Sequence, residues 1–190
     1  LLRQIDETVL SSSANTVVVG QAIVDIIAAK TNFPFLSLFT VDYQSGNIVL
    51  LAVSHSEEIR RIDPQITTDL KIPLTHEKNI LVQAIKGKGE KETSNLSDAI
   101  STADDRSLPL TIQKKLGITS LLAIPLIVGS RTVGVMLIGL GQRRQFITPE
   151  EEDLISRLVA VVGVALDNIL LTRALKEANE RHTTLSACNL

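Results

Sequence analysis

The chain has 190 residues and a formal net charge of −2, with both signs interspersed, so it offers no long basic run of the kind that neutralises nucleic-acid phosphates. Its single cysteine, Cys188, can form neither an internal disulfide nor a cysteine cluster, which indicates a reducing, cytoplasmic compartment. The apolar stretch over residues 17–29 is broken by polar side chains and is shorter than the roughly 20 residues of a membrane-spanning helix, so we expect no membrane insertion.

Two helices are expected at the start of the chain. Apolar residues recur at helical spacing within residues 1–14, at Leu2, Ile5 and Val9, and predict an N-terminal helix and linker. Asn15 or Thr16 then caps a second helix that continues to about Lys30. The sequence begins without a methionine or a signal-peptide pattern, which indicates a segment of a longer protein.

A β-hairpin follows. Residues 33–42 (FPFLSLFTVD) and 47–54 (NIVLLAVS) are rich in β-branched and aromatic residues, and Gly46 supplies the turn between them. Residues 55–69 are polar and contain a proline, so they predict irregular structure or a short helix. Residues 69–74 predict a brief edge strand.

The middle of the chain is expected to be the least regular part. A helix is predicted to begin with Thr75 as its cap and to end at Gly87 and Gly89. A short strand, a long polar loop and a helix over residues 108–116 follow, and the next glycine ends that helix. Loops of this length within compact domains are usually functional or mobile.

The last part predicts a second hairpin and a long exit helix. Residues 120–140 (SLLAIPLIVGSRTVGVMLIGL) form two apolar strands around a Gly-Ser turn, with Pro125 at a bulge or at the rim of the sheet because it has no N–H to donate. The exit helix begins with Thr148 as cap and Pro149 at the first helical position, and is expected to run nearly to the end of the chain.

In this order the elements resemble a GAF domain. The resemblance is carried by LGITSLLAIPLIVGSRTVGVMLIGL, by RRQFITPEEEDLISRLVAVVGVAL directly after it, and by KIPLTHEKNILVQAIKGKG in the middle of the chain. It implies an α+β fold in which the N- and C-terminal helices cover one face of a six-stranded antiparallel sheet. Loops and short helices would cover the other face and enclose a pocket. We divide the chain into an N-terminal helix and linker (1–14), a GAF domain (15–171) and a C-terminal helical linker (172–190).

Catalysis is not expected of this domain. The three histidines, His55, His76 and His182, show no metal-ligand spacing, and no serine sits in a nucleophile elbow. The Asn-Lys-x-Phe-Asp-Glu signature of cyclic-nucleotide-binding GAF domains is absent, and a lone terminal cysteine suits neither a covalent bilin nor the thiol chemistry of the related methionine sulfoxide reductases. The resemblance does not identify a cofactor.

The resemblance implies a sensory, regulatory module of a bacterial signalling protein. Its ligand would be an unknown small molecule lying between the sheet and residues 76–118, with Phe39, Ile80, Asp104 and Arg106 as the candidate binding residues. The signal would pass to an output domain in the same chain, such as a histidine kinase. The alternative is a GAF module without a pocket that serves only as a dimerisation spacer.

A second apolar stripe on the exit helix predicts a homodimer. Its members follow alternating spacings of four and three residues: Val164, Asn168, Leu171, Leu175, Ala178 and His182. This is the seam of a coiled coil, in which Asn168 and His182 would weaken the pairing but fix its register. The alternative is a single amphipathic helix whose polar positions face water.

Overall fold

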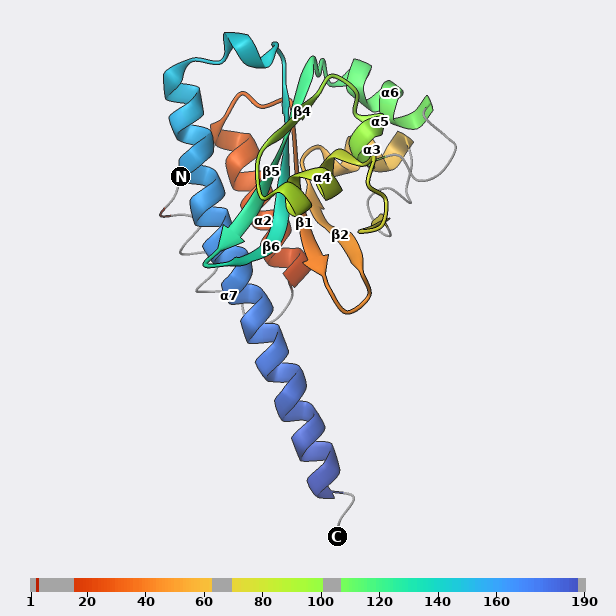
Figure 1. Ribbon diagram of the computed structural model, residues 1–190, viewed down its shortest axis with the longest axis vertical. Helices are drawn as coiled ribbons and strands as arrows, with labels where there is room; N and C mark the ends of the chain where they lie inside the picture. Colours follow the sequence, from red (N-terminus) through yellow and green to blue (C-terminus); the bar gives the residue numbers. More distant parts are fainter. Residues whose placement is uncertain (1–2, 4–15, 63–69, 101–106, 188–190) are drawn as a thin grey trace.

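Six strands form one antiparallel sheet in the order β3-β2-β1-β6-β5-β4. The computed structural model describes residues 3, 16–62, 70–100 and 107–187 (Figure 1). The strands are β1 (Phe35–Asp42), β2 (Asn47–Val53), β3 (Lys71–Pro73), β4 (Lys91–Thr93), β5 (Ser120–Val128) and β6 (Arg131–Leu140). The helices are α2 (Thr16–Lys30), α3 (Ser56–Ile62), α4 (Ile80–Gly87), α5 (Ser97–Ile100), α6 (Ser107–Lys115), the 3-10 helix η1 (Arg144–Phe146) and α7 (Pro149–Ala187). The expected helix over residues 1–14 lies outside the described residues.

The helices cover both faces of the sheet. In Figure 1, α2 and α7 lie on one side of it and α3 to α6 on the other. The pairing of β1 with β6 places the first and last strands of the fold side by side at the centre. This arrangement confirms the expected α+β fold with a six-stranded antiparallel sheet.

Each central strand therefore faces two cores. The helix-side core lies under α2 and α7 and includes Leu36, Leu38, Leu122 and Ile138. The pocket-side core lies under α3 to α6 and includes Phe35, Phe39, Leu121 and Leu137. Successive residues of a strand point to opposite faces, so a sheet covered on both faces requires uninterrupted apolar runs such as those of β5 and β6.

The turns contain glycine at the positions where the sequence predicts it. Gly46, Gly117 and Gly129 have positive φ angles of 69°, 67° and 60°, a backbone region that disfavours other residues. The β5–β6 register shifts between Leu126 and Ile127, one residue after Pro125. Pro125 also lies beyond Ala123, the last β5 residue paired with β4, which agrees with its expected place beside a bulge.

The start of α4 differs from the prediction. Its N-cap is Asn79 rather than Thr75: the Asn79 side chain accepts a hydrogen bond of 2.9 Å from Leu81 N, and turns precede it. A tertiary contact accounts for the later start, because Asn79 Nδ2 donates to Ala99 O at 2.8 Å. The helix ends at Gly87, as predicted, although the left-handed residue after it is Lys88, with φ of 49°, and not a glycine.

We expect Asn79→Ala to lower the free energy of unfolding by about 2 kcal/mol. The substitution removes the helix cap and leaves Ala99 O without its buried donor. Urea unfolding measures the change, with the exposed Asn32→Ala as the control, expected to stay within about 0.5 kcal/mol of the parent. Equal effects of the two substitutions would contradict this role of Asn79.

Candidate functional site

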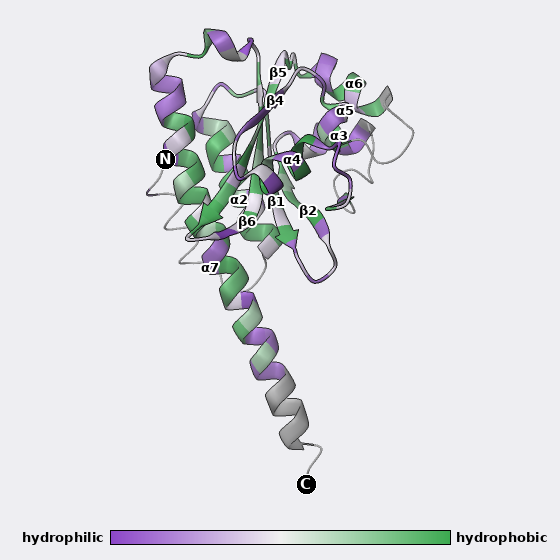
Figure 2. Ribbon diagram, in the orientation of Figure 1, coloured by the Kyte–Doolittle hydropathy of each residue, from purple (hydrophilic) through white to green (hydrophobic). Residues whose placement is uncertain are grey.

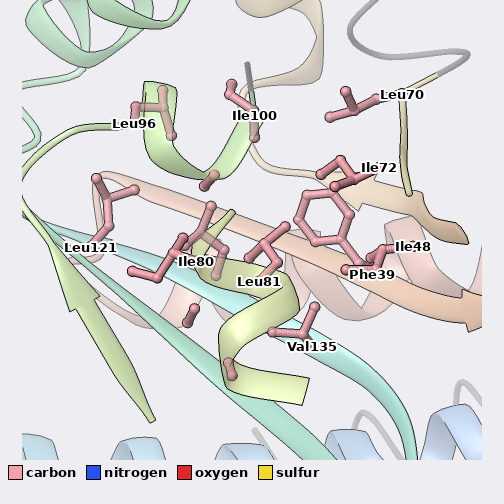
Figure 3. Close-up of a cluster of buried hydrophobic side chains, with 14 of the residues drawn as sticks. Phe39, Ile48, Leu70, Ile72, Ile80, Leu81, Leu96, Ile100, Leu121 and Val135 are labelled. Carbon is pink, nitrogen blue, oxygen red and sulfur yellow. The ribbon is translucent and has the colours of Figure 1, made fainter. Parts of the chain in front are cut away.

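The candidate ligand site is a small cavity in the pocket-side core. Its volume is about 10 Å³, room for roughly one water molecule. Side chains from β1, β2, α3, α5 and α6, together with Leu70 directly before β3, line it: Phe35, Ser37, Phe39, Leu50, Val53, Ile59, Ile100 and Ile112. Figure 3 shows the cluster of which this lining is a part, with Phe39, Leu70 and Ile100 labelled. Apart from one hydroxyl group, the lining side chains that the structure describes are hydrocarbon.

That hydroxyl belongs to Ser37, on the central strand β1. Ser37 is 1% exposed and pairs with Val53 on one side and Leu137 on the other. Its Oγ is the one buried side-chain polar atom, among the residues that the structure describes, that has no hydrogen-bond partner. Burying a hydroxyl without a partner is unfavourable by about 1–3 kcal/mol, so the position calls for an explanation.

Ser54 is a second buried serine of the same hairpin, and its hydroxyl group does have a hydrogen-bond partner. It is equally buried, at 1% exposure, and follows β2 directly. Its Oγ accepts a hydrogen bond of 2.8 Å from Leu36 N, and its own N–H donates to Leu36 O at 2.8 Å. The fold therefore provides a partner for one buried serine and leaves the neighbouring one without.

Two of the four predicted ligand-binding residues lie in this core. Phe39 is fully buried and lines the cavity. Ile80 is 4% exposed in the same cluster, as Figure 3 shows, but it is not part of the cavity lining. Asp104 and Arg106 lie outside the described residues. Sequence reasoning missed Ser37, although a lone serine between Phe35 and Phe39 on one face of a strand was a usable signal.

No titratable side chain lines the cavity, as far as the described residues show it. The shifted groups lie at the surface: a hydrogen bond from Lys86 lowers the pKa of Glu77, and one to Asp153 raises the pKa of Arg157. Within the described residues, no group of three metal-binding side chains could hold an ion, and His55 and His76 are exposed. This part of the chain therefore contains no arrangement for acid–base or metal chemistry at the cavity.

A wider surface groove, of about 510 Å³, lies between α4 and the turns of both hairpins. Its cationic side chains are already engaged: Lys86 with Glu77, Arg131 with Asp167, and Lys88 with Ser130 O. The groove therefore offers less to an anionic ligand than its three positive charges would suggest.

The second candidate surface is the part of α7 beyond the sheet. The first half of this 39-residue helix buries Ile155, Leu158, Val162 and Leu166 in the helix-side core. The second half extends away from the domain (Figure 1), and its colouring in Figure 2 mixes apolar and polar residues. Leu171 and Leu175 are 49% and 68% exposed there, and Val164, in the first half, is 53% exposed.

The other predicted seam residues lie on the same helix, and their role in a seam remains a prediction. Asn168 and Ala178 are exposed, while the side chain of His182 lies outside the described residues. By length and composition, residues 149–180 of α7 also qualify as a candidate membrane span, which is weak evidence because the helix packs one face on the sheet of this domain.

An ion pair attaches α7 to the second hairpin where the helix leaves the domain. Arg131, at the start of β6, pairs with Asp167 on α7. Asp42, at the end of β1, has its pKa lowered mainly by hydrogen bonds from the Ser45 side chain and backbone, with a smaller contribution from the charge of Arg173 on α7.

Comparison with known proteins shows which family and which solved structures share this architecture. A family model described as the GAF domain matches residues 17–166. No curated protein matches the chain. Among solved structures, the chain is similar to the GAF domain of a phosphoenolpyruvate-protein phosphotransferase from Coxiella burnetii, with 20% identity, 93% of this chain and 94% of that chain covered, and a TM-score of 0.62.

Two further structures show how varied the proteins with this fold are. The GAF domain of a two-component sensor histidine kinase from Bacillus halodurans is 18% identical, with 79% and 92% of the two chains covered and a TM-score of 0.56. The free methionine-R-sulfoxide reductase from Neisseria meningitidis is 16% identical, with 90% and 88% covered and a TM-score of 0.58. At these identities the likeness concerns the fold, which regulatory domains and an enzyme share.

Proposed function

Because the chain belongs to the GAF domain family, we propose that it is a sensory module that binds a small molecule in its pocket-side core and signals through a dimeric exit helix. The receiver would be an output domain in the same chain, such as the histidine kinase of the similar Bacillus halodurans protein. The observation that carries the proposal is the row of exposed apolar side chains on the half of α7 that leaves the domain.

The exposed row suits a parallel partner helix. Leu171 and Leu175 leave about half or more of their surface open to water in the single chain, although they stand on a long helix at coiled-coil spacing. Pairing two such helices would bury these side chains against their counterparts. Asn168 lies between Val164 and Leu171 on the same stripe, where a buried amide would hold one register.

The cavity and the exit helix are connected through the sheet. Ser37 and Phe39 lie on β1, which pairs along its length with β6. The backbone at Gly134 on β6 comes close to both Phe39 O and the side chain of Leu166 on α7. A small displacement of β1 by a ligand therefore has a short path to α7. To bias a two-state helix pairing tenfold, the ligand needs about 1.4 kcal/mol of differential affinity.

We propose the domain limits accordingly. Residues 1–14 would form an N-terminal helix and linker, residues 15–171 the sensory domain, and residues 172–190 the helical connection to the output domain. We propose a regulatory rather than catalytic role, in the cytoplasm and without nucleic-acid partners.

A specific observation favours the alternative of a spacer without a ligand. A cavity of about 10 Å³ is nearly filled, and a ligand larger than water has to displace part of its walls. In the spacer function, α7 dimerises in the same way but nothing enters the core. Mass spectrometry of small molecules released from the native protein distinguishes the two, since a stoichiometric compound supports the sensor.

Sedimentation equilibrium tests the dimer that both functions share. We expect a dimer at tens of micromolar, because coiled-coil pairing would cover the apolar row of α7. A monomer throughout this concentration range would refute the proposed transmission through paired exit helices.

A further inference from the structure

We propose that the ligand is a small, uncharged and largely apolar molecule with a single hydroxyl or carbonyl group, and that Ser37 selects it by hydrogen bonding to that group. The inference rests on the proposed sensory function and adds the chemical class of the ligand and the residue that recognises it. It begins from the unpaired Ser37 hydroxyl in the lining of the pocket-side cavity.

The lining argues against a charged ligand. Phe35 and Phe39 come from β1, and Ile59, Ile100 and Ile112 come from three short helices on the same side of the sheet. None of these side chains carries a charge, and a charge taken from water into such surroundings without a counter-charge is strongly disfavoured. The phenylalanine rings offer a cation only a weak cation–π contact. An amine, a carboxylate or a phosphate therefore finds no counter-charge in the described lining.

The serine argues against a purely hydrocarbon ligand. With a hydrocarbon in the cavity, Ser37 Oγ keeps its unpaired state, whereas a ligand hydroxyl or carbonyl gives it the missing hydrogen bond. A water molecule is a poor substitute, since an ordered buried water normally makes about three hydrogen bonds and the described part of the lining offers one polar side chain.

The position of Ser37 strengthens the argument. Alanine would fit at this place on β1 with less polar surface to bury, and the structure does satisfy the equally buried Ser54. The unpaired hydroxyl of Ser37 lowers the stability of the protein without ligand. Its presence is explained if a bound molecule supplies the missing hydrogen bond.

A ligand larger than the cavity has to displace part of its lining, and we expect the side chains on the short helices to move. Ile59, Ile100 and Ile112 stand on α3, α5 and α6, which have seven, four and nine residues. The opposite wall is the central strand β1, paired on both sides. We expect the largest displacement at the isoleucines and only a small one at β1, the strand that carries Ser37.

Methyl NMR with 1-butanol, butyrate and butylammonium as probes tests the class of ligand. We expect 1-butanol to shift the methyl signals of Ile59, Ile100 and Ile112 saturably, with little change at Ile138 and Ile155 in the helix-side core. The two ions should bind about 100-fold more weakly, because no counter-charge replaces their lost hydration. Equal binding of an ion, or no saturable shift by 1-butanol, overturns the proposal.

Ser37→Ala tests the recognising residue, with Ser54→Ala as a matched control. We expect Ser37→Ala to weaken 1-butanol binding about fivefold, the equivalent of one hydrogen bond, and to raise the Tm by about 2–4 °C. Ser54→Ala should lower the Tm by a similar amount, since it leaves Leu36 N unpaired, and should change the affinity less than twofold. Unchanged 1-butanol affinity in Ser37→Ala overturns the assignment.

Failure of this inference is distinguishable from failure of the proposed function. The dimer is measured by sedimentation without any probe, and neither serine lies on the exposed row of α7. A dimer that binds no probe leaves the exit-helix proposal standing and removes the ligand class. A monomer that binds 1-butanol removes the exit-helix proposal and leaves the ligand class standing.

Discussion

Replacing both Leu171 and Leu175 with aspartate is expected to convert the proposed dimer into a monomer, with a dissociation constant at least about 1000-fold higher. The two leucines are 49% and 68% exposed in the single chain, so pairing would remove four large side chains from water per dimer. Losing that burial and placing carboxylates in the seam together account for about 4 kcal/mol or more. Sedimentation equilibrium measures the dissociation constant.

Lys176→Asp provides the matched control. It changes the net charge by −2, as the double leucine substitution does, but Lys176 lies on the same helix outside the predicted seam. We expect its dimer to dissociate no more than about threefold more readily. Circular dichroism should show that both variants keep the fold, because neither site contributes to the cores. Equal loss of dimer in both variants would point to charge repulsion rather than a seam.

Local sequence signals predicted the beginning of α7 correctly. Thr148 Oγ accepts from Glu151 N at 3.2 Å, and a Glu151 carboxylate oxygen accepts from Thr148 N at 2.9 Å, which is a capping box. All partners lie within three residues of one another, so the pattern is readable in the sequence. The same holds for the turn at Gly129 and for the two-sided burial of β5 and β6.

The start of α4 was not predictable from local signals, whereas its end at Gly87 was. Thr75 is an ordinary N-cap residue, yet the structure uses Asn79. The Asn79 side chain donates to Ala99 O, 20 residues away, and such a tertiary contact outweighs a local preference of about 1 kcal/mol.

The candidate site, too, could be predicted from the sequence only in part. Phe39, named as a candidate because of the resemblance, does lie in the pocket-side core. That Ser37 has no partner while Ser54 has one depends on how Leu36 N meets the end of β2, which the sequence does not reveal. The expected involvement of Asp104 and Arg106 remains a prediction, because both lie outside the described residues.

The fold itself should depend most sharply on Gly134. Leu126 pairs with Gly134 and Ile127 with Thr132, so Val133 is the extra residue of a β-bulge in β6. A Cβ atom at Gly134 would overlap the carbonyl oxygen of Phe39 and lie 2.7 Å from Leu166 Cδ2. We expect Gly134→Ala to lower the free energy of unfolding by about 3 kcal/mol or more, because a central strand has to move. Urea unfolding measures it.

Gly163→Ala makes the same chemical change with the opposite expected sign. Gly163 is also buried, but its Cβ would lie 3.8 Å from Leu126 Cβ and from Val128 Cγ2, which is ordinary van der Waals contact. It stands in the interior of α7, where alanine is favoured over glycine by about 1 kcal/mol. We therefore expect this variant to be more stable than the parent by about 0.5–1 kcal/mol. If both variants were destabilised equally, the close approach of β6 to β1 and α7 would not be the reason for glycine at position 134.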